Sequence, residues 1–349
     1  MRVRIRLGQR KLWHDLQNHP SRRADNAVYL RGSLFIRSLG SRGQRDLLRY
    51  NLYWRGQQRW HLFKLTSGGT LTTLHSFDST DGSNPEDALI QATNGNFYGT
   101  TPIGGANGYG TIFEINPGGA LTTLHNFDST DGGNPDRGGL IQATDGNFYG
   151  TAYYGGANNK GTVFKITPHG VLTTLHSFDS TDGANPRGRL VQATDGNLYG
   201  TTWMGGAANA GTIFTITPAG ALTTLHVFDN SDGAGLIGGL VQGTDGNFYG
   251  TAYAGGPNDD GTVFSLSMGL GPFIETLPTT GTAGSTVKIL GTNLTGATSV
   301  TFNGLAAAFT VVRPSEISAA VPTGATTGTV QATTPAGTLS SNVAFQVRP

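Results

Sequence analysis

The chain has 349 residues, a formal net charge of +1 and no cysteine, and 54 of its residues are glycine. The absence of cysteine excludes disulfides, thiolate catalysis and Cys-ligated zinc, and the absence of any 18-residue apolar run excludes a hydrophobic transmembrane helix. So much glycine without a collagen period is typical of many tight turns. The net charge conceals a division, because residues 1–60 hold 14 of the 23 Lys and Arg but only 3 of the 22 Asp and Glu.

Residues 1–60 are a basic segment with three interspersed tryptophans, Trp13, Trp54 and Trp60. Basic residues interleaved with aromatics can bind nucleic acid, but no helical or strand period organises this segment. We therefore expect no nucleic-acid partner, and interpret 1–60 as a disordered leader or as the product of a mis-assigned start codon. The segment lacks the apolar run and small-residue cleavage site of a secretory signal.

Residues 61–267 repeat with a period of about 50 residues. The motifs Asp/Asn-Gly-Asn-x-Tyr-Gly-Thr and Gly-Thr-Ile/Val-Phe recur with this spacing. A third motif, Leu-Thr-Thr-Leu-His-x-Phe, ends at Phe77, Phe127, Phe178 and Phe228. Each unit has four short stretches rich in Thr, Val, Ile, Tyr and Phe, separated by turn residues and without helical periodicity. Four strands in about 50 residues indicate the blade of a β-propeller, in the length range of the kelch class.

The phase of the repeat leaves the closure of a ring open. Complete four-strand units cover 87–127, 138–178 and 188–228, and the last unit, 238–267, supplies only three strands. Leu71–Phe77 is a spare fourth strand ahead of them. If this strand pairs with the last unit, about four repeats close into a ring with no exposed sheet edge. Otherwise the repeats form an open part of a longer array.

Residues 271–349 have a different composition, rich in Thr, Ala, Gly and Val. Turn residues separate short apolar stretches every 8–12 positions, which predicts a small β-sandwich. The predicted strands lie near 286–290, 298–302, 306–312, 316–320, 328–333 and 341–347. The stretch resembles an IPT/TIG domain in Gly291-x-Asn293-Leu294, Phe302-Asn303-Gly304, Val321-Pro322-x-Gly324-Ala325 and Thr334-Pro335-x-Gly337. The resemblance implies an immunoglobulin-like fold that serves as a binding or spacer module.

The repeat resembles the bacterial tandem repeat called GloVer, which occurs in large exported proteins. The residues that carry the resemblance are Gly170-x-Leu172 to Phe178, Asp195-Gly196-Asn197-x-Tyr199-Gly200-Thr201 and Gly211-Thr212-Ile213-Phe214. The resemblance implies an extracellular or cell-surface location and no enzymatic activity. The chain shows no signal peptide, sorting motif or membrane tail, so its export is an expectation from the resemblance alone.

The loop after the fourth strand reads Asp-Ser-Thr-Asp-Gly-x-Asn-Pro in three copies, and the fourth copy, which begins at Asp229, has lost the Asn and Pro. Side-chain oxygens at positions 1, 4 and 7 are suited to a hard cation such as calcium, but the same residues also form tight turns without an ion. We favour the turn and keep structural calcium as the alternative; no other cofactor is expected. The candidate ligands are Asp78, Asp81, Asn84, Asp128, Asp131, Asn134, Asp179, Asp182 and Asn185.

Two further sets of repeated residues are candidates for binding. The histidines His75, His125, His176 and His226 recur at one position, which is typical of packing rather than of a metal site. The loop after the second strand varies between repeats, and such loops are usual binding positions. Aromatic rings and amides there suit a glycan or protein ligand, namely Tyr153, Trp203, Tyr253, Asn158, Asn209 and Asn258.

Catalysis is not expected, because the sequence contains no nucleophile elbow, Walker loop or zinc signature. Acidic residues that depart from the repeat, such as Glu86, Asp87, Glu114, Asp136, Asp259 and Asp260, show no paired partner in the sequence. We therefore predict an all-β, monomeric, non-enzymatic binding or scaffold protein. The alternative is a propeller hydrolase or lyase, which would require a cluster of unlike polar residues at one end of the ring axis.

Overall fold

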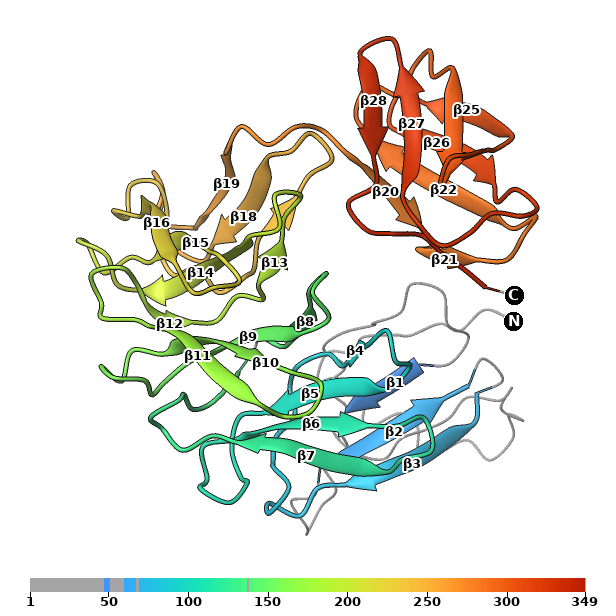
Figure 1. The fold of residues 1–349 in the computed structure, drawn as a ribbon. Helices are drawn as coiled ribbons and strands as arrows, with labels where there is room; N and C mark the ends of the chain where they lie inside the picture. Colours follow the sequence, from blue (N-terminus) through green and yellow to red (C-terminus); the bar gives the residue numbers. More distant parts are fainter. Residues whose placement is uncertain (1–46, 51–59, 67–68, 137, 349) are drawn as a thin grey trace, which may run out of the picture. The chain divides into compact units, whose positions relative to one another are not determined.

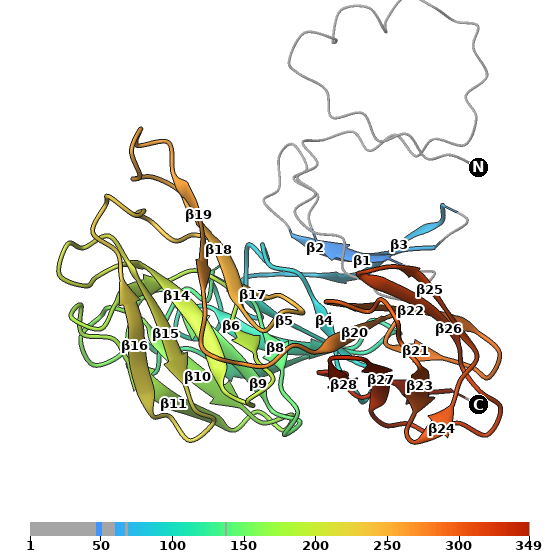
Figure 2. The same cartoon turned by 90° about the horizontal axis from the view of Figure 1, so that it is seen from above.

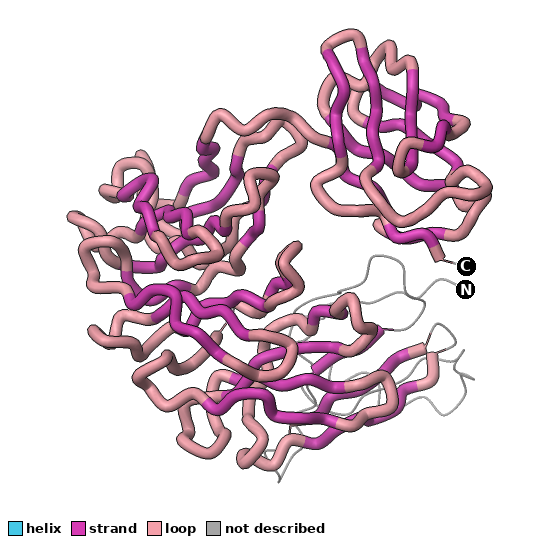
Figure 3. The backbone as a smooth tube through the Cα atoms, in the orientation of Figure 1, coloured by secondary structure: helices cyan, strands magenta, loops and turns pink. Residues whose placement is uncertain are grey.

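The structure is a computed structural model that describes residues 47–50 (backbone only), 60–66, 69–136 and 138–348. All of the regular structure in these ranges is β-strand, as Figure 3 shows. None of the described residues forms a helix long and apolar enough to cross a membrane. The predicted all-β class is confirmed. Most of the expected basic leader lies outside the described residues.

The repeats form successive antiparallel sheets, one after another along the chain (Figure 1). The first contains β1 (Leu47–Tyr50), β2 (His61–Leu65) and β3 (Leu71–Ser76). The second contains β4 (Ile90–Gln91), β5 (Phe97–Thr101), β6 (Thr111–Ile115) and β7 (Leu121–Asn126). The third contains β8 (Ile141–Gln142), β9 (Phe148–Ala152), β10 (Thr162–Ile166) and β11 (Leu172–Ser177).

The fourth and fifth sheets complete the repeat region. The fourth contains β12 (Ala184–Pro186), β13 (Val191–Gln192), β14 (Leu198–Met204), β15 (Thr212–Ile216) and β16 (Leu222–Val227), of which β14, β15 and β16 run side by side in Figure 2. The fifth contains only β17 (Val241–Gln242), β18 (Phe248–Ala252) and β19 (Thr262–Leu266). This confirms that the last unit supplies three strands.

The spare strand has a different partner from the one that ring closure would require. In the described residues β3 pairs with β2, with Leu71 opposite Leu65 and His75 opposite Leu62. β2 in turn pairs with β1, which lies within the segment expected to be a leader. Because β3 belongs to its own sheet, it does not supply the fourth strand of the β17–β19 sheet.

The first hairpin of each unit depends on a carboxylate that accepts a hydrogen bond from a tyrosine. Gly146 has φ 81°, and Asp145 accepts hydrogen bonds from the Asn147 backbone N–H (3.0 Å) and from the Tyr149 hydroxyl (2.7 Å). The second sheet has Asn94 in place of the aspartate. There Tyr98 donates instead to Glu114 on the neighbouring strand, at 2.8 Å. Glu114 thus replaces the missing carboxylate, so it is not without a partner.

The second, third and fourth repeat sheets each pack their two faces against two different neighbouring sheets, whereas the first and fifth each share a cluster with one described repeat sheet. We call the face toward the following repeat the forward face and the other the backward face. Between the third and fourth sheets, Tyr149, Val163 and Phe178 of the forward face meet the backward face, which contributes Leu198, Phe214 and Ile216. Equivalent clusters join the other neighbouring sheets. The repeat region therefore has no single core.

The C-terminal domain is a two-sheet sandwich, as predicted. One sheet contains β20 (Ile274–Leu277), β22 (Thr286–Gly291), β26 (Glu316–Ala320) and β25 (Phe309–Arg313). The other contains β24 (Leu305–Ala306), β23 (Ser299–Phe302), β27 (Val330–Thr334) and β28 (Gly337–Ser340), and β21 (Thr280–Gly281) pairs with β29 (Gln346–Val347). One enclosed cluster, which includes Ile289, Phe302 and Phe345, forms its core. The sequence did not predict β20 or β28, and the predicted strand at 306–312 is two shorter strands.

Candidate functional site

The aromatic residues after the second strand lie at the boundary between neighbouring repeats. Tyr153 is 8% exposed, Trp203 is half-buried and Tyr253 is 75% exposed. The guanidinium carbon of Arg187 lies 4.9 Å from the ring centroids of both Tyr153 and Trp203, which are themselves 6.0 Å apart. The cation therefore occupies part of the ring surface that was predicted to bind a ligand. The neighbouring Tyr154 packs edge-on against Tyr153 at 4.4 Å and remains 48% exposed.

Arg187 also forms an ion pair with a neighbouring repeat. Its Nη2 lies 3.4 Å from Oδ2 of Asp136, which stands 51 residues earlier. Asp136 and Arg187 occupy the same position of successive repeats, directly after the proline of the Asn-Pro pair. The residues at this position in the four repeats are Glu86, Asp136, Arg187 and, after a leucine in place of the proline, Ile237. We call the group formed by Asp136, Tyr153, Tyr154, Arg187 and Trp203 the aromatic–arginine cluster. It combines aromatic rings with both signs of charge at a point where the repeats differ in sequence.

A second polar group lies beside this cluster. Asp87 Oδ2 accepts a hydrogen bond from the Gly139 backbone N–H at 3.1 Å, and Arg189 donates to the Leu140 carbonyl at 2.7 Å. Burial, together with the negative charge of Asp136, raises the pKa of Asp87 to about 7, although the Gly139 N–H and Arg189 act in the opposite direction. The carboxyl group can therefore exchange a proton near neutral pH.

The paired partners of these acidic residues were not apparent from the sequence. Asp87 and Asp136 were described above as acidic residues without a partner, and this is wrong, because their partners are supplied by adjacent repeats. Asp259 also has one, since its Oδ1 accepts a hydrogen bond from the Gly255 N–H at 2.8 Å. One signal was available: Asp136 and Arg187 have opposite charge at one repeat position in neighbouring units.

The side-chain amides of the predicted loop asparagines form hydrogen bonds with backbone groups. Asn158 donates a hydrogen bond to the Phe178 carbonyl at 3.2 Å, and Asn209 accepts one from the Gly205 N–H at 2.9 Å. Asn107, at the position of Asn158 in the preceding repeat, donates to the Phe127 carbonyl in the same way. Asn258 occupies this position in the last repeat, where no described strand follows β19 to accept its hydrogen bond. The amides thus hold the loops at the cluster in a fixed conformation.

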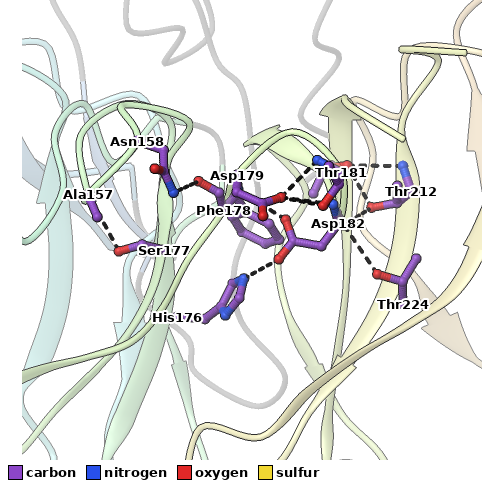
Figure 4. A network of polar contacts seen from close by, with 11 residues as sticks. Ala157, Asn158, His176, Ser177, Phe178, Asp179, Thr181, Asp182, Thr212 and Thr224 are labelled. Atoms are coloured by element: carbon purple, nitrogen blue, oxygen red, sulfur yellow. Dashed lines mark hydrogen bonds and ion pairs between the residues drawn. The ribbon is translucent and has the colours of Figure 1, made fainter. Parts of the chain in front are cut away.

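The loops considered for calcium contain a hydrogen-bonded turn that is joined to a histidine (Figure 4). Asp179 Oδ1 accepts from the backbone N–H and hydroxyl of Thr181, and Asp182 Oδ1 accepts from the Asp179 N–H. Asp182 Oδ2 lies 2.6 Å from His176 Nε2. The hydrogen bonds from Thr181 lower the pKa of Asp179. Three of the four carboxylate oxygens are therefore engaged by the protein itself.

The fourth loop shows that the contacts of the aspartates form without the Asn-Pro pair. It has Gly235-Leu236 in place of Asn-Pro, yet Asp229, Ser231, Asp232 and His226 repeat the same contacts. The asparagine side chain is also directed elsewhere, because Asn185 donates to the Tyr153 carbonyl at 2.9 Å. Among the described residues, no group of three or more His, Asp or Glu is placed to hold a metal ion. These contacts favour the turn, and structural calcium stays a prediction.

The repeated histidines do not converge on one another. In each of the four repeats the ring nitrogen Nε2 lies 2.5–2.6 Å from an aspartate of the same repeat. Each ring also packs edge-on against the phenylalanine two residues later, at 4.7–5.1 Å. Both contacts are internal to one repeat, which agrees with a structural role.

Comparisons with known proteins give distant likenesses to solved structures and a match to a family. Among solved structures, a gluconolactonase from Xanthomonas campestris is 15% identical with a TM-score of 0.39, and the match covers 80% of this chain and 83% of that one. A putative 6-phosphogluconolactonase from Bacteroides uniformis is 16% identical with a TM-score of 0.42, and the match covers 83% of this chain and 90% of that one. Likenesses this distant assign no activity, and no curated protein matches the chain.

Two family models match the sequence. The IPT/TIG domain matches residues 272–347, which is the two-sheet sandwich. The Gloeobacter/Verrucomicrobia repeat matches residues 55–264 and 136–307, which together span more than half of the chain and include all of the repeat sheets from β2 to β19. The chain therefore belongs to the Gloeobacter/Verrucomicrobia repeat family and ends in an IPT/TIG domain.

Proposed function

We propose that this protein is a non-enzymatic binding or scaffold protein of the cell surface or extracellular space, and that its repeat region binds a glycan at the aromatic–arginine cluster. The observation that carries the proposal is the contact of Arg187 with Tyr153, Trp203 and Asp136 beside the exposed ring of Tyr154. The location and the absence of enzymatic activity follow what the two families imply.

The chemistry of the cluster suits a sugar. A sugar ring presents apolar C–H faces to an aromatic side chain and hydroxyl groups to charged side chains. Tyr154 and Trp203 offer aromatic surface, and the carboxylate of Asp136 and the guanidinium of Arg187 offer acceptors and donors. Because Arg187 is held by two rings and an ion pair, little of its side-chain freedom remains to be lost on binding.

The proposal can be tested with a glycan array followed by calorimetry on the best ligand. Replacement of Trp203 or Tyr154 by Ala should weaken binding by about threefold to tenfold, the usual contribution of an aromatic contact. Ile103→Ala is the matched control, because Ile103 is the exposed residue at the position of Tyr154 in the preceding repeat. Binding that is absent, or equally weakened by Ile103→Ala, would rule out this site.

One observation favours the second candidate, a hydrolase or lyase. Asp87 has a pKa of about 7 and lies among unlike charged residues of neighbouring repeats, and a general base works best when its pKa is near the working pH. Ester, lactone and glycoside substrates should be screened between pH 5 and 9. An activity that Asp87→Asn abolishes would replace the binding proposal by the enzymatic one.

A further inference from the structure

The last repeat sheet has an unfilled position at one edge. In the second, third and fourth sheets the third strand pairs with a fourth, whereas β19 pairs only with β18 among the described residues. After Leu266 the chain passes through Ser267–Pro272 without a strand and enters β20. The backbone groups along one edge of β19 therefore have no sheet partner in the described residues, which makes this edge a template for strand addition.

The forward face of this sheet is also exposed, because no described repeat sheet follows it. Val263 is 82% exposed, whereas the equivalent Val163 and Ile213 are 0% and 1% exposed. Val241 and Tyr249, on the other two strands of the same sheet, are also exposed. The last sheet therefore has an open forward face as well as an open strand edge among the described residues, and Val263 marks the open face.

The complete repeats show what occupies this position. In the third repeat β11 pairs with β10, with Leu172 opposite Ile166 and His176 opposite Val163. Beyond the strand, the Phe178 backbone N–H donates to the Gly161 carbonyl at 3.0 Å, and the Asn158 side chain donates to the Phe178 carbonyl. Equivalent backbone bonds from Phe127 and Phe228 reach Gly110 and Gly211. The fourth strand is therefore held along its edge and at its end.

The last sheet keeps each of these receiving groups. β19 has the sequence Thr-Val-Phe-Ser-Leu, close to the Thr-Val-Phe-Lys-Ile of β10. Gly261 has φ 90° and occupies the position of Gly161, whose φ is 95°. Asn258 occupies the position of Asn158. The groups that would receive a fourth strand are therefore all present, and none of the residues that the structure describes supplies that strand.

We propose that the open edge of β19 binds an extended strand from another polypeptide that carries the pattern Leu-x-x-Leu-His-x-Phe of this repeat's own fourth strand. A second copy of this chain is a poor donor, because its four segments with this pattern, β3, β7, β11 and β16, are already paired within their sheets. The mode is strand addition, in which main-chain bonds supply affinity and alternate side chains supply specificity. The inference does not depend on glycan binding.

The test uses the full-length protein and a fluorescent peptide with the sequence of residues 172–183, Leu-Thr-Thr-Leu-His-Ser-Phe-Asp-Ser-Thr-Asp-Gly. Fluorescence anisotropy should show saturable one-to-one binding. Binding should be lost when alternate backbone amides of the peptide are N-methylated, because the strand can then no longer donate to β19. A scrambled peptide of the same composition should not bind.

Two matched substitutions locate the peptide on the protein. Asn258→Ala removes the amide that would hold the end of the bound strand, and should weaken binding by about twofold to tenfold, the usual range for one hydrogen bond. Asn158→Ala removes the same amide from a repeat whose fourth strand is in place, and should leave the affinity unchanged. The proposal would be overturned if millimolar peptide did not bind, or if the scrambled peptide bound equally well. It would also be overturned if the protein sedimented as a dimer and Val263→Lys dissociated that dimer.

Discussion

The repeat region and the IPT/TIG domain are both built from antiparallel β-sheets, but they bury their apolar side chains in opposite ways. In the repeat region every cluster is shared between two successive sheets, so that Phe178 of one repeat packs against Phe214 of the next at 5.3 Å. In the IPT/TIG domain two sheets enclose one cluster that includes Phe302 and Phe345. A single repeat therefore cannot complete its own core, whereas the sandwich can.

The strongest test of this comparison is to separate the parts. Residues 271–349, expressed alone, should fold and give a cooperative thermal transition by circular dichroism, because their core is complete within the segment. Residues 138–187, a single repeat, should remain unfolded, because both faces of the sheet lose their partners. An unfolded 271–349 segment would contradict the domain boundary, and a folded single repeat would contradict the shared core.

Two substitutions of the same kind should act on different parts of the protein. Phe214→Ala and Phe302→Ala each remove a fully buried ring and should cost about 3–5 kcal/mol. All four tryptophans lie outside the IPT/TIG domain, so tryptophan fluorescence reports on the rest of the chain. Phe214→Ala should lower the denaturant midpoint measured by fluorescence. Phe302→Ala should leave that midpoint in place and lower the circular-dichroism transition of the isolated 271–349 segment; a shift of the fluorescence midpoint would show that the two cores are coupled.

The sequence predicted the repeat well, because side chains that recur every 50 residues report on contacts that also recur. The same reasoning failed where the repeat is degenerate. The residues ahead of Leu71 lack the Gly-Thr-Ile/Val-Phe motif, so the sequence predicted β3 to be a spare strand, whereas β3 pairs with β2, which in turn pairs with β1. In the sandwich, β20 and β28 are short and flanked by Pro and Gly, so the sequence pattern did not predict them.

The site shows the other limit of sequence reasoning. The position of Tyr153 and Trp203 was predicted, but their burial was not, because it depends on Arg187 in the loop directly after β12. The pairing of Arg187 with Asp136 occurs once along the chain, and its only signal in the sequence is the opposite charge at one repeat position in neighbouring units. Only spatial proximity across neighbouring repeats brings these charges together.

Asp87 makes the stability of the repeat region depend on pH. Its folded pKa of about 7 lies above the ordinary value of 3.8, so the folded state holds the proton more tightly than the unfolded state does. This contribution to stability is fully present below about pH 4 and is lost as the pH rises through 7. Glu86 and Asp136 add to the effect, and Arg189 opposes it.

Replacing Asp87 by Asn should therefore flatten the dependence of stability on pH. Between pH 4 and pH 8 the loss in the natural protein should exceed that in the variant by about 1 kcal/mol or more, since one pKa unit corresponds to about 1.4 kcal/mol. Urea titrations followed by tryptophan fluorescence would measure it. Asp260→Asn, at an exposed loop carboxylate, is the control and should not change the slope; an unchanged slope in Asp87→Asn would contradict the raised pKa.

A smaller effect should follow from the one hairpin in which Asn94 replaces the aspartate. Burial and the hydrogen bond to Glu114 raise the pKa of Tyr98 to about 12. Glu114→Gln replaces a charged acceptor by a neutral one and should cost about 1 kcal/mol. Lys165→Gln, at the same position of the following repeat, should cost nothing measurable, because Tyr149 already donates to Asp145. Equal costs for the two substitutions would show that Glu114 does not replace the missing aspartate.

The smallest effect is expected from calcium, which would distinguish the two regions because only the repeats contain the Asp-Ser-Thr-Asp-Gly loops. In each loop three carboxylate oxygens accept hydrogen bonds or pair with histidine, so a cation would have to displace contacts that are already made. We expect the midpoint of the tryptophan-monitored transition to be the same in millimolar calcium and in chelator. A calcium-binding loop would instead stabilise the folded state by about 2.7 kcal/mol per site at 100 times Kd. A rise that appears in the full chain, becomes smaller in Asp128→Asn and is absent from the isolated 271–349 segment would establish calcium ligation in place of the plain turn.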